Sequence, residues 1–177
     1  MFDDLGELER RDGELQLRFV RRLAHTPDKV FDALTQPEHL RAWFPTDIIG
    51  ERTTGAPLKF EFRDGEGPTI EGTLLAYDPP NLVEYQWGDD ETLRFELTPD
   101  GVGTVLTFVN TFAEIGKAAR DAAGWHTCLD LLGHELAGTT PPWEQPARWK
   151  QVHPRYVETL GPDASTIGPP DSKPDYQ

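Results

Sequence analysis

Apolar and polar residues alternate along most of the chain between residues 14 and 112. The first such stretch covers residues 14–23, where Leu15, Leu17 and Phe19 are separated by polar neighbours. A period of two is the pattern of a β-strand with one buried face. Similar stretches follow between residues 46 and 112, divided by short turns rich in Gly, Pro, Asp and Asn. Connections this short join antiparallel neighbours, so this part of the chain predicts a six-stranded meander.

Two short helices are predicted directly after the first strand. Thr26 is a good N-cap and Pro27 suits the first helical position. Pro37 ends this helix and begins a second one, which Pro45 closes.

The pattern changes to a helical period between residues 115 and 137. The spacing of apolar residues is four, three, four, three, four, which marks one face of a long helix. That face is Ala118, Ala122, Trp125, Leu129, Leu132 and Leu136. The side chains on this face are small in the first half of the helix, which we call the slim half, and large in the second half. A helix of this shape laid on a curved sheet can leave space beside its slim half, so the sequence predicts an internal cavity.

The chain ends are expected to differ from this central region. Residues 1–13 are acidic and polar and predict a loose segment. Residues 14–138 are expected to form the main domain. Residues 139–160 predict a helical extension, kinked or split at Pro154, and residues 161–177 are rich in Pro, Gly, Ser and Asp, which predicts a disordered tail. Along the extension, four apolar residues recur at helical spacing and could pack on the domain or form an interaction face: Trp149, Val152, Tyr156 and Leu160.

Charge narrows the partners that this chain can have. The formal net charge is −14, so the average surface should repel nucleic acids and anionic lipids. No apolar run reaches the roughly 20 residues of a membrane span, and the first 13 residues carry no secretory signal. A single cysteine, Cys128, excludes an intrachain disulfide. We therefore expect a cytoplasmic protein without a nucleic-acid partner or membrane insertion.

Four stretches in this order resemble a known family. They are RRLAHTPDKVFDALTQPEHLRAWF at residues 21–44, GTLLAYDPPNLVEYQW at 72–87, FELTPDGVGTVLTF at 95–108 and GWHTCLDLL at 124–132. Together they resemble the activator of heat-shock-protein-90 ATPase homologue family, within the SRPBCC superfamily of START-like and birch-pollen-allergen-like domains. The resemblance implies an α+β helix-grip fold, in which a curved antiparallel sheet wraps around a long C-terminal helix. It also implies binding of a small apolar or amphipathic ligand.

The inward-facing residues of these elements are the candidate cavity lining. They are Trp43, Phe44, Phe60, Phe62, Trp87, Phe95, Phe108, Asn110, Ala122, Trp125, His126 and Leu129. Pockets of this kind are mostly apolar with a few polar groups. Asn110 could bond a ligand, a water molecule or His126. The alternative interpretation of the whole set is a closed core without usable space.

His126 is the weak candidate for catalysis. It could act as an acid or base near neutral pH, or pack beside Trp125 with an ordinary hydrogen bond. Asp130, four residues later, could orient it or form a plain surface pair. Cys128 points about 200° away from His126 on a helix, and no metal-binding motif is present. We predict no metal and no cofactor.

Three functions remain open from the sequence. The first is a module that binds a small apolar or amphipathic molecule. The second is a chaperone-associated or stress-related interaction module. The third is a cyclase-like or dehydratase-like enzyme that uses His126, and we expect that the protein is not an enzyme.

Overall fold

A computed structural model describes residues 4–65 and 67–177 of the chain. Eight antiparallel strands form one curved sheet in the order β1-β2-β8-β7-β6-β5-β4-β3. Their bounds are β1 Glu7–Arg11, β2 Glu14–Leu23, β3 Thr46–Ile49, β4 Pro57–Phe62, β5 Ile70–Asp78, β6 Leu82–Trp87, β7 Glu91–Asp100 and β8 Gly103–Phe112. Strands β3 to β8 follow one another as neighbours, which confirms the six-stranded meander. β2 closes onto β8, with Phe19 opposite Phe108.

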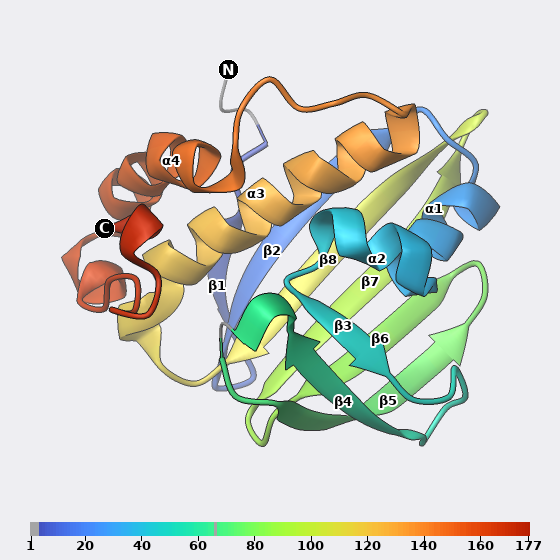
Figure 1. Ribbon diagram of the computed structural model, residues 1–177, viewed down its shortest axis with the longest axis horizontal. Coiled ribbons are helices and arrows are strands. Elements are labelled where there is room, and N and C mark those ends of the chain that lie inside the picture. The colour runs from blue at the N-terminus through green and yellow to red at the C-terminus, as the bar shows by residue number, and fades with distance from the viewer. Residues whose placement is uncertain (1–3, 66) are drawn as a thin grey trace.

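Two short helices connect β2 to β3, as the sequence predicts. Helix α1 spans Pro27–Thr35, and the hydroxyl of Thr26 accepts a hydrogen bond from the Lys29 N–H at its start. Helix α2 spans Pro37–Trp43 and ends directly before Phe44 and Pro45. The two helices cover one end of the sheet (Figure 1).

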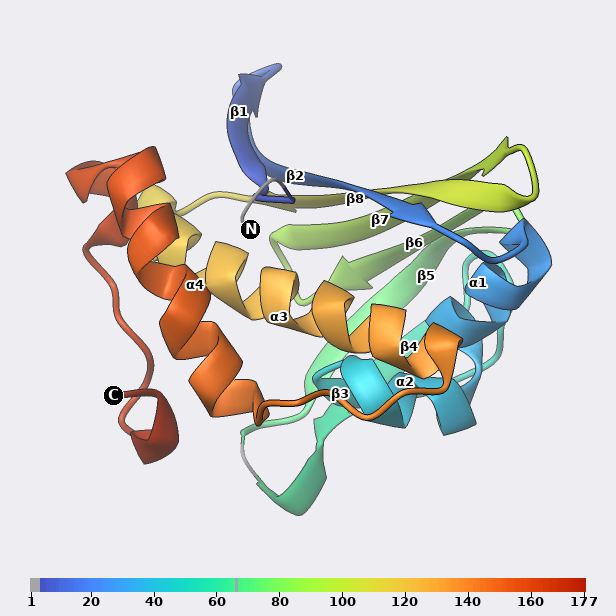
Figure 2. The same cartoon turned by 90° about the horizontal axis from the view of Figure 1, so that it is seen from above.

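The long helix α3 spans Ala118–Ala137 and crosses the concave face of the sheet (Figures 1 and 2). A single 3-10 turn, Ile115–Lys117, precedes it, so the predicted start at residue 115 is three residues early for the α-helix. Gly138 ends it with a φ of 69°, and Thr139 donates its N–H to the His134 carbonyl. This is a glycine-dependent helix end. The elements together form an α+β helix-grip fold.

The chain ends are more ordered than the sequence suggests. Residues 7–11, expected to be loose, form β1 and pair with β2 along their whole length. Helix α4, Gln145–Leu160, is one helix that contains Pro154 and is not split there. The tail forms two 3-10 turns, Pro162–Ser165 and Pro174–Tyr176. The tail therefore contains short turns and one buried residue, Ala164, where its local composition alone suggests none.

The end of the chain packs against the start of α3. Ala164 is buried, and Ile167 donates its N–H to the Gly116 carbonyl over 3.0 Å. A Cβ placed on Gly116 would collide with the Thr166 hydroxyl, which shows how closely the two segments approach. Within the described residues, no helix has both the length and the apolar character that crossing a membrane requires.

Aromatic rings fill the space between α3 and the sheet. Phe95 and Phe108 stack with their centroids 4.5 Å apart, and Phe108 meets Trp125 of α3 at 5.0 Å. Trp43 contacts Phe95 edge to face at 5.9 Å. The small residues in the first half of α3 are also part of this core. Its four alanines are fully buried, namely Ala118, Ala119, Ala122 and Ala123.

Candidate functional site

Two hollows flank helix α3 in the described part of the molecule. One includes Gly124 and the other includes Gly133. These glycines are nine residues apart, about two and a half helical turns, so they lie on opposite sides of the helix. A Cβ at either position would meet no atom within 4 Å. Each glycine therefore borders open space.

The hollow beside Gly124 has a volume of about 450 Å³, and we call it the tryptophan cleft. Trp87 from β6, Trp125 from α3 and Trp149 from α4 all line it. The other lining residues are Pro45, Phe62, Gly67, Pro68, Ile70, Glu91, Lys117, Arg120, Asp121, Gly124, Thr127, Cys128, Gln145, Pro169, Pro170, Ser172, Lys173 and Tyr176. Small-molecule sites typically have volumes of roughly 300–1,000 Å³, and the volume of this cleft lies within that range. Most of the residues that line it are apolar, and a few are charged.

Four of the charged residues that line this cleft lie next to the start of α3. Lys117 Nζ is 3.1 Å from Glu91 Oε2 and 3.6 Å from Asp121 Oδ2. Arg120 Nε donates to Asp121 Oδ1 over 2.8 Å. Burial raises the pKa of the Glu91 carboxyl, although the Lys117 ammonium opposes that effect. The cleft therefore has a polar end formed by paired charges.

Asn110 lies behind this polar end and is fully buried. Its amide nitrogen donates to Glu91 Oε1 at 3.4 Å and to the Thr92 carbonyl at 3.3 Å. Its Oδ1 atom has no hydrogen-bond partner within the described residues. Asn110 therefore supports Glu91, which lines the cleft, and does not bond His126.

The far wall of the cleft comes from the C-terminal part of the chain. Trp149 donates its indole N–H to the Arg120 carbonyl at 3.2 Å and meets the Tyr176 ring at 5.6 Å. The Lys173 ammonium lies 5.7 Å from the Phe62 ring and 5.5 Å from the Tyr176 ring. Lys173 thus spans the two walls, because Phe62 belongs to the sheet and Tyr176 to the tail.

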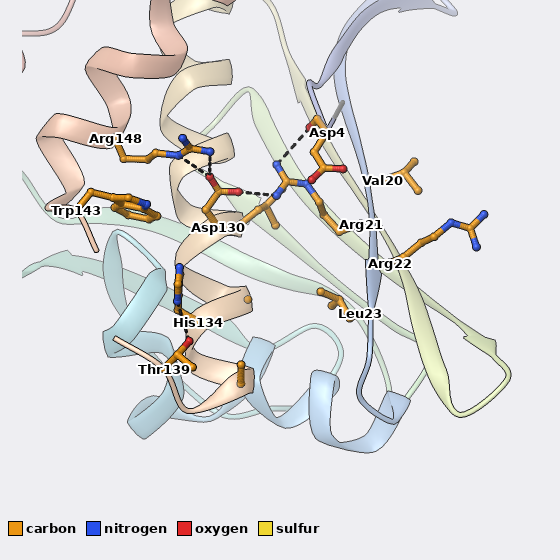
Figure 3. Close-up of a pocket in the computed structure, with 13 residues that line it drawn as sticks. Asp4, Val20, Arg21, Arg22, Leu23, Asp130, His134, Thr139, Trp143 and Arg148 are labelled. Atoms are coloured by element: carbon orange, nitrogen blue, oxygen red, sulfur yellow. Dashed lines mark hydrogen bonds and ion pairs between the residues drawn. The ribbon is translucent and has the colours of Figure 1, made fainter. Parts of the chain in front are cut away.

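The hollow on the other side of α3 has a volume of about 620 Å³, and we call it the arginine hollow (Figure 3). Its centre is Asp130, which binds Arg21 of β2 at 2.7 Å and Arg148 of α4 at 2.8 Å. The Arg148 guanidinium also lies over the Trp143 ring at 5.6 Å. Figure 3 shows Arg22 directed away from this group. The main charges of the hollow are therefore already paired with one another.

His126 is buried between α3 and α4 and lines neither hollow. Its Nδ1 atom is 2.8 Å from the Tyr156 hydroxyl, and its Nε2 atom is 3.5 Å from Asp130 Oδ2. Burial lowers the pKa of the imidazole to about 4, against the opposing charge of Asp130. A neutral, enclosed imidazole has the surroundings of a packing residue, and nothing in this arrangement brings a substrate to it.

Asp130 itself remains ionised in this network. Burial alone would raise the pKa of its carboxyl, but the imidazole and the two guanidinium groups outweigh that effect and hold the pKa below its usual value. The carboxylate therefore links β2, α3 and α4 through charge-assisted hydrogen bonds.

The structure places the twelve predicted lining residues in different surroundings. Three of them line the tryptophan cleft: Phe62, Trp87 and Trp125. Leu129 borders the arginine hollow. The others are buried and line neither hollow: Trp43, Phe44, Phe60, Phe95, Phe108, Asn110, Ala122 and His126. The role of the set in binding stays a prediction.

Several cleft residues were missed because they come from segments expected to be loose or auxiliary. Trp149, Lys173 and Tyr176 belong to the extension and the tail. Gly124 carried a usable signal, since a glycine inside a helix costs stability and often has a packing or functional reason. Lys117 and Glu91 gave no such signal, because their pairing depends on how α3 lies on the sheet.

Cys128 lines the tryptophan cleft, but its thiol is buried. Burial raises its pKa to about 12, so it is a thiol and not a thiolate at neutral pH. His126, two residues earlier on α3, does not line this cleft. Within the described residues, no group of three or more His, Cys, Asp and Glu side chains is arranged to hold a metal ion.

A sheet of this topology with a long helix on its concave face defines a helix-grip domain. Residues 24–137 match the family described as "Activator of Hsp90 ATPase homolog 1-like protein". The matched range covers more than half of the chain, and the chain belongs to this family. The comparison with curated proteins gives no match.

Solved structures support the fold. The crystal structure of CalU16 from Micromonospora echinospora has a TM-score of 0.71 at 20% identity, over 88% of this chain and 96% of that one. A conserved protein of unknown function from Enterococcus faecalis, EF2215, has a TM-score of 0.71 at 21% identity, over 88% and 90%. The Aha1 dimer from Colwellia psychrerythraea has a TM-score of 0.59 at 21% identity, over 68% and 95%.

Proposed function

We propose that this domain binds a small amphipathic molecule in the tryptophan cleft. The observation that carries the proposal is the open volume of about 450 Å³ beside Gly124, bordered by tryptophans from three separate elements. Tryptophan rings supply large apolar contact areas and also have an N–H group for hydrogen bonding. The paired charges at one end give the cleft a polar pole, which suits an amphipathic molecule better than a purely apolar one.

The other functions considered from the sequence receive less support. A catalytic role for His126 needs access to a substrate, and its side chain is 2% exposed. An interaction face on α4 needs exposed apolar residues, and Trp149, Val152 and Tyr156 are all buried against the domain. We therefore favour binding over catalysis and over a partner docked on this face of α4.

The test uses N-phenylnaphthylamine, a neutral probe that fluoresces when it enters an apolar site. We expect the protein to enhance its fluorescence, and Gly124→Leu to abolish the enhancement because the new side chain occupies the cleft. Gly133→Leu is the matched control, since it adds the same side chain to the same helix but fills the arginine hollow.

Equal loss in both variants, or no enhancement with the unmodified protein, would contradict the proposal. Native mass spectrometry of protein purified from its own cells gives an independent measurement. A bound species that is lost in Gly124→Leu and retained in Gly133→Leu would identify the natural ligand by mass.

A further inference from the structure

Three aromatic rings that line the tryptophan cleft are only partly buried. They are Phe62 of β4, Trp87 of β6 and Trp125 of α3. In the adjoining core, by contrast, Trp43 is 2% exposed and Phe108 is 0% exposed. Large apolar side chains that stay partly uncovered around one hollow are typical of a ligand-binding groove. These three rings therefore have contact surface to offer to a guest in the cleft.

The two tryptophans of this set are held firmly on their core side. Trp125 packs on Phe44 and on Phe108, with ring centroids 5.9 and 5.0 Å apart. Trp87 packs on Phe60 at 4.7 Å, and the two tryptophans meet edge to face at 6.4 Å. Because both indole rings already have a defined orientation, a guest that matches them does not have to order them on binding.

The indole N–H groups distinguish these two tryptophans from the buried ones. Trp43 and Trp149 each donate the indole N–H to a backbone carbonyl, at 2.8 and 3.2 Å. Within the described residues, no acceptor bonds the indole N–H of Trp87 or Trp125. These two rings are positioned by ring contacts alone, and their N–H groups are left for water or for a polar group of a guest.

The opposite wall of the cleft also presents a ring. Trp149 comes from α4, beyond the family match at residues 24–137, and is 5% exposed. It stacks on His153 with the ring centroids 4.3 Å apart, and its N–H bond to the Arg120 carbonyl ties it to α3. A cleft with fixed rings on both walls suits a flat guest better than a puckered one.

We propose that the ligand of the tryptophan cleft is a planar aromatic molecule, and that contacts with the rings of Trp87 and Trp125 select it over saturated molecules of the same size. The inference rests on the proposed binding function and adds the chemical class of the ligand. Offset stacking and edge-to-face contacts stabilise aromatic pairs beyond simple burial, by an amount that corresponds to about two- to tenfold in affinity. A saturated molecule with the same carbon skeleton is as apolar but lacks these contacts.

The test compares 2-naphthalenemethanol with decahydro-2-naphthalenemethanol by titration calorimetry. The two alcohols share one carbon skeleton and one aliphatic hydroxyl group, and both are uncharged, so the charged residues of the cleft do not distinguish them. We expect the aromatic alcohol to bind about two- to tenfold tighter. Equal binding, or tighter binding of the saturated alcohol, would overturn the inference.

Matched variants assign the preference to the cleft. The quantity compared is the ratio of the two affinities in each variant, because a general loosening of the cleft weakens both alcohols together. Trp125→Leu should remove most of the preference, whereas Trp125→Phe keeps a ring and should retain most of it. Trp143→Leu replaces a partly buried tryptophan that lines the arginine hollow instead, and should leave the ratio unchanged.

The same ratio in Trp125→Leu as in the unmodified protein, or equal changes in Trp125→Leu and Trp143→Leu, would overturn the assignment to the cleft rings. Urea unfolding shows whether each variant is folded. The comparison of the two alcohols in the unmodified protein tests the ligand class even where Trp125→Leu does not fold.

The outcomes separate this inference from the proposed function. If both alcohols bind equally and Gly124→Leu removes the binding of both, then the aromatic preference is wrong and the binding function stands. If neither alcohol binds and N-phenylnaphthylamine does not bind either, both proposals fail.

Discussion

The imidazole of His126 on α3 is hydrogen-bonded to the hydroxyl of Tyr156 on α4, with Nδ1 and Oη 2.8 Å apart. The same hydroxyl accepts a hydrogen bond from the Gly6 N–H at 2.9 Å. The phenolic proton is then available for Nδ1, which leaves the Nε2–H directed at Asp130. One buried contact thus joins the start of the chain, the long helix and the C-terminal helix.

This contact predicts that stability falls in mild acid. The pKa of His126 is lowered to about 4 in the folded protein from 6.5, mainly by burial, so the unfolded chain takes up the proton first. The stabilisation is complete above pH 6.5 and is lost as pH falls through the window from 6.5 to 4. Between pH 7.5 and pH 5 the cost is about 2 kcal/mol, from about 1.4 kcal/mol per pH unit.

The measurement is urea unfolding of the wild type and of His126→Gln at both pH values. We expect the variant to be less stable overall but to lose less stability on acidification. The pKa of His153 is also lowered by burial, but this residue is present in both proteins, so its contribution cancels. An equal acid-induced loss in the two proteins would contradict the assignment to His126.

The sequence predicts the central fold well because the fold depends on local signals. Alternation in β2, the Thr26 cap, the prolines around α2 and the stripe of α3 each act within a few residues, and each matches the structure. By contrast, β1 shows no clear alternation. Its formation depends on pairing with β2, and the tail is ordered by contacts with α3 that lie far away in sequence.

The candidate site was harder to predict for a physical reason. A side chain that faces inward does not always line a hollow. Phe95 and Phe108 face inward, but they stack on each other and fill the core. The open space lies at the flank of α3, where Gly124 has no side chain to fill it. Its second wall comes from Trp149 and the tail, and their position depends on tertiary contacts that a single sequence does not display.

Two neighbouring arginines of β2 form ion pairs that should contribute differently to stability, because one pair is buried and the other is exposed. Arg21 binds Asp130 with both side chains at most 15% exposed, whereas Arg22 binds Asp100 with both at least half exposed. Asp130→Asn should destabilise the protein by about 2–4 kcal/mol, because two guanidinium groups lose their buried partner. Asp100→Asn should cost less than about 1 kcal/mol. Chemical denaturation of both variants measures the difference, and similar costs would show that the Asp130 network contributes little.

Cys128 predicts a thiol that does not react in the folded protein. Its side chain is 4% exposed and burial raises its pKa to about 12, so neither access nor the thiolate form favours attack. A thiol reagent at pH 8 should label the native protein slowly and label it fully in denaturant. Rapid native labelling would mean that the cleft opens at Cys128 far more than the structure indicates.

Gly124 lies within α3 and Gly138 directly follows it. Replacement by alanine should have opposite effects on stability at these two positions. Gly124 has helical backbone geometry and a new Cβ there meets no atom within 4 Å, so Gly124→Ala should stabilise the protein by about 0.5–1 kcal/mol through the better helix propensity of alanine. Gly138 also has free space, but its φ is 69°, a conformation that costs an L-residue roughly 1 kcal/mol. Gly138→Ala should therefore destabilise by a similar amount. Thermal and urea unfolding of the two variants measure the signs, and destabilisation by Gly124→Ala would indicate that the floor of the cleft is closed.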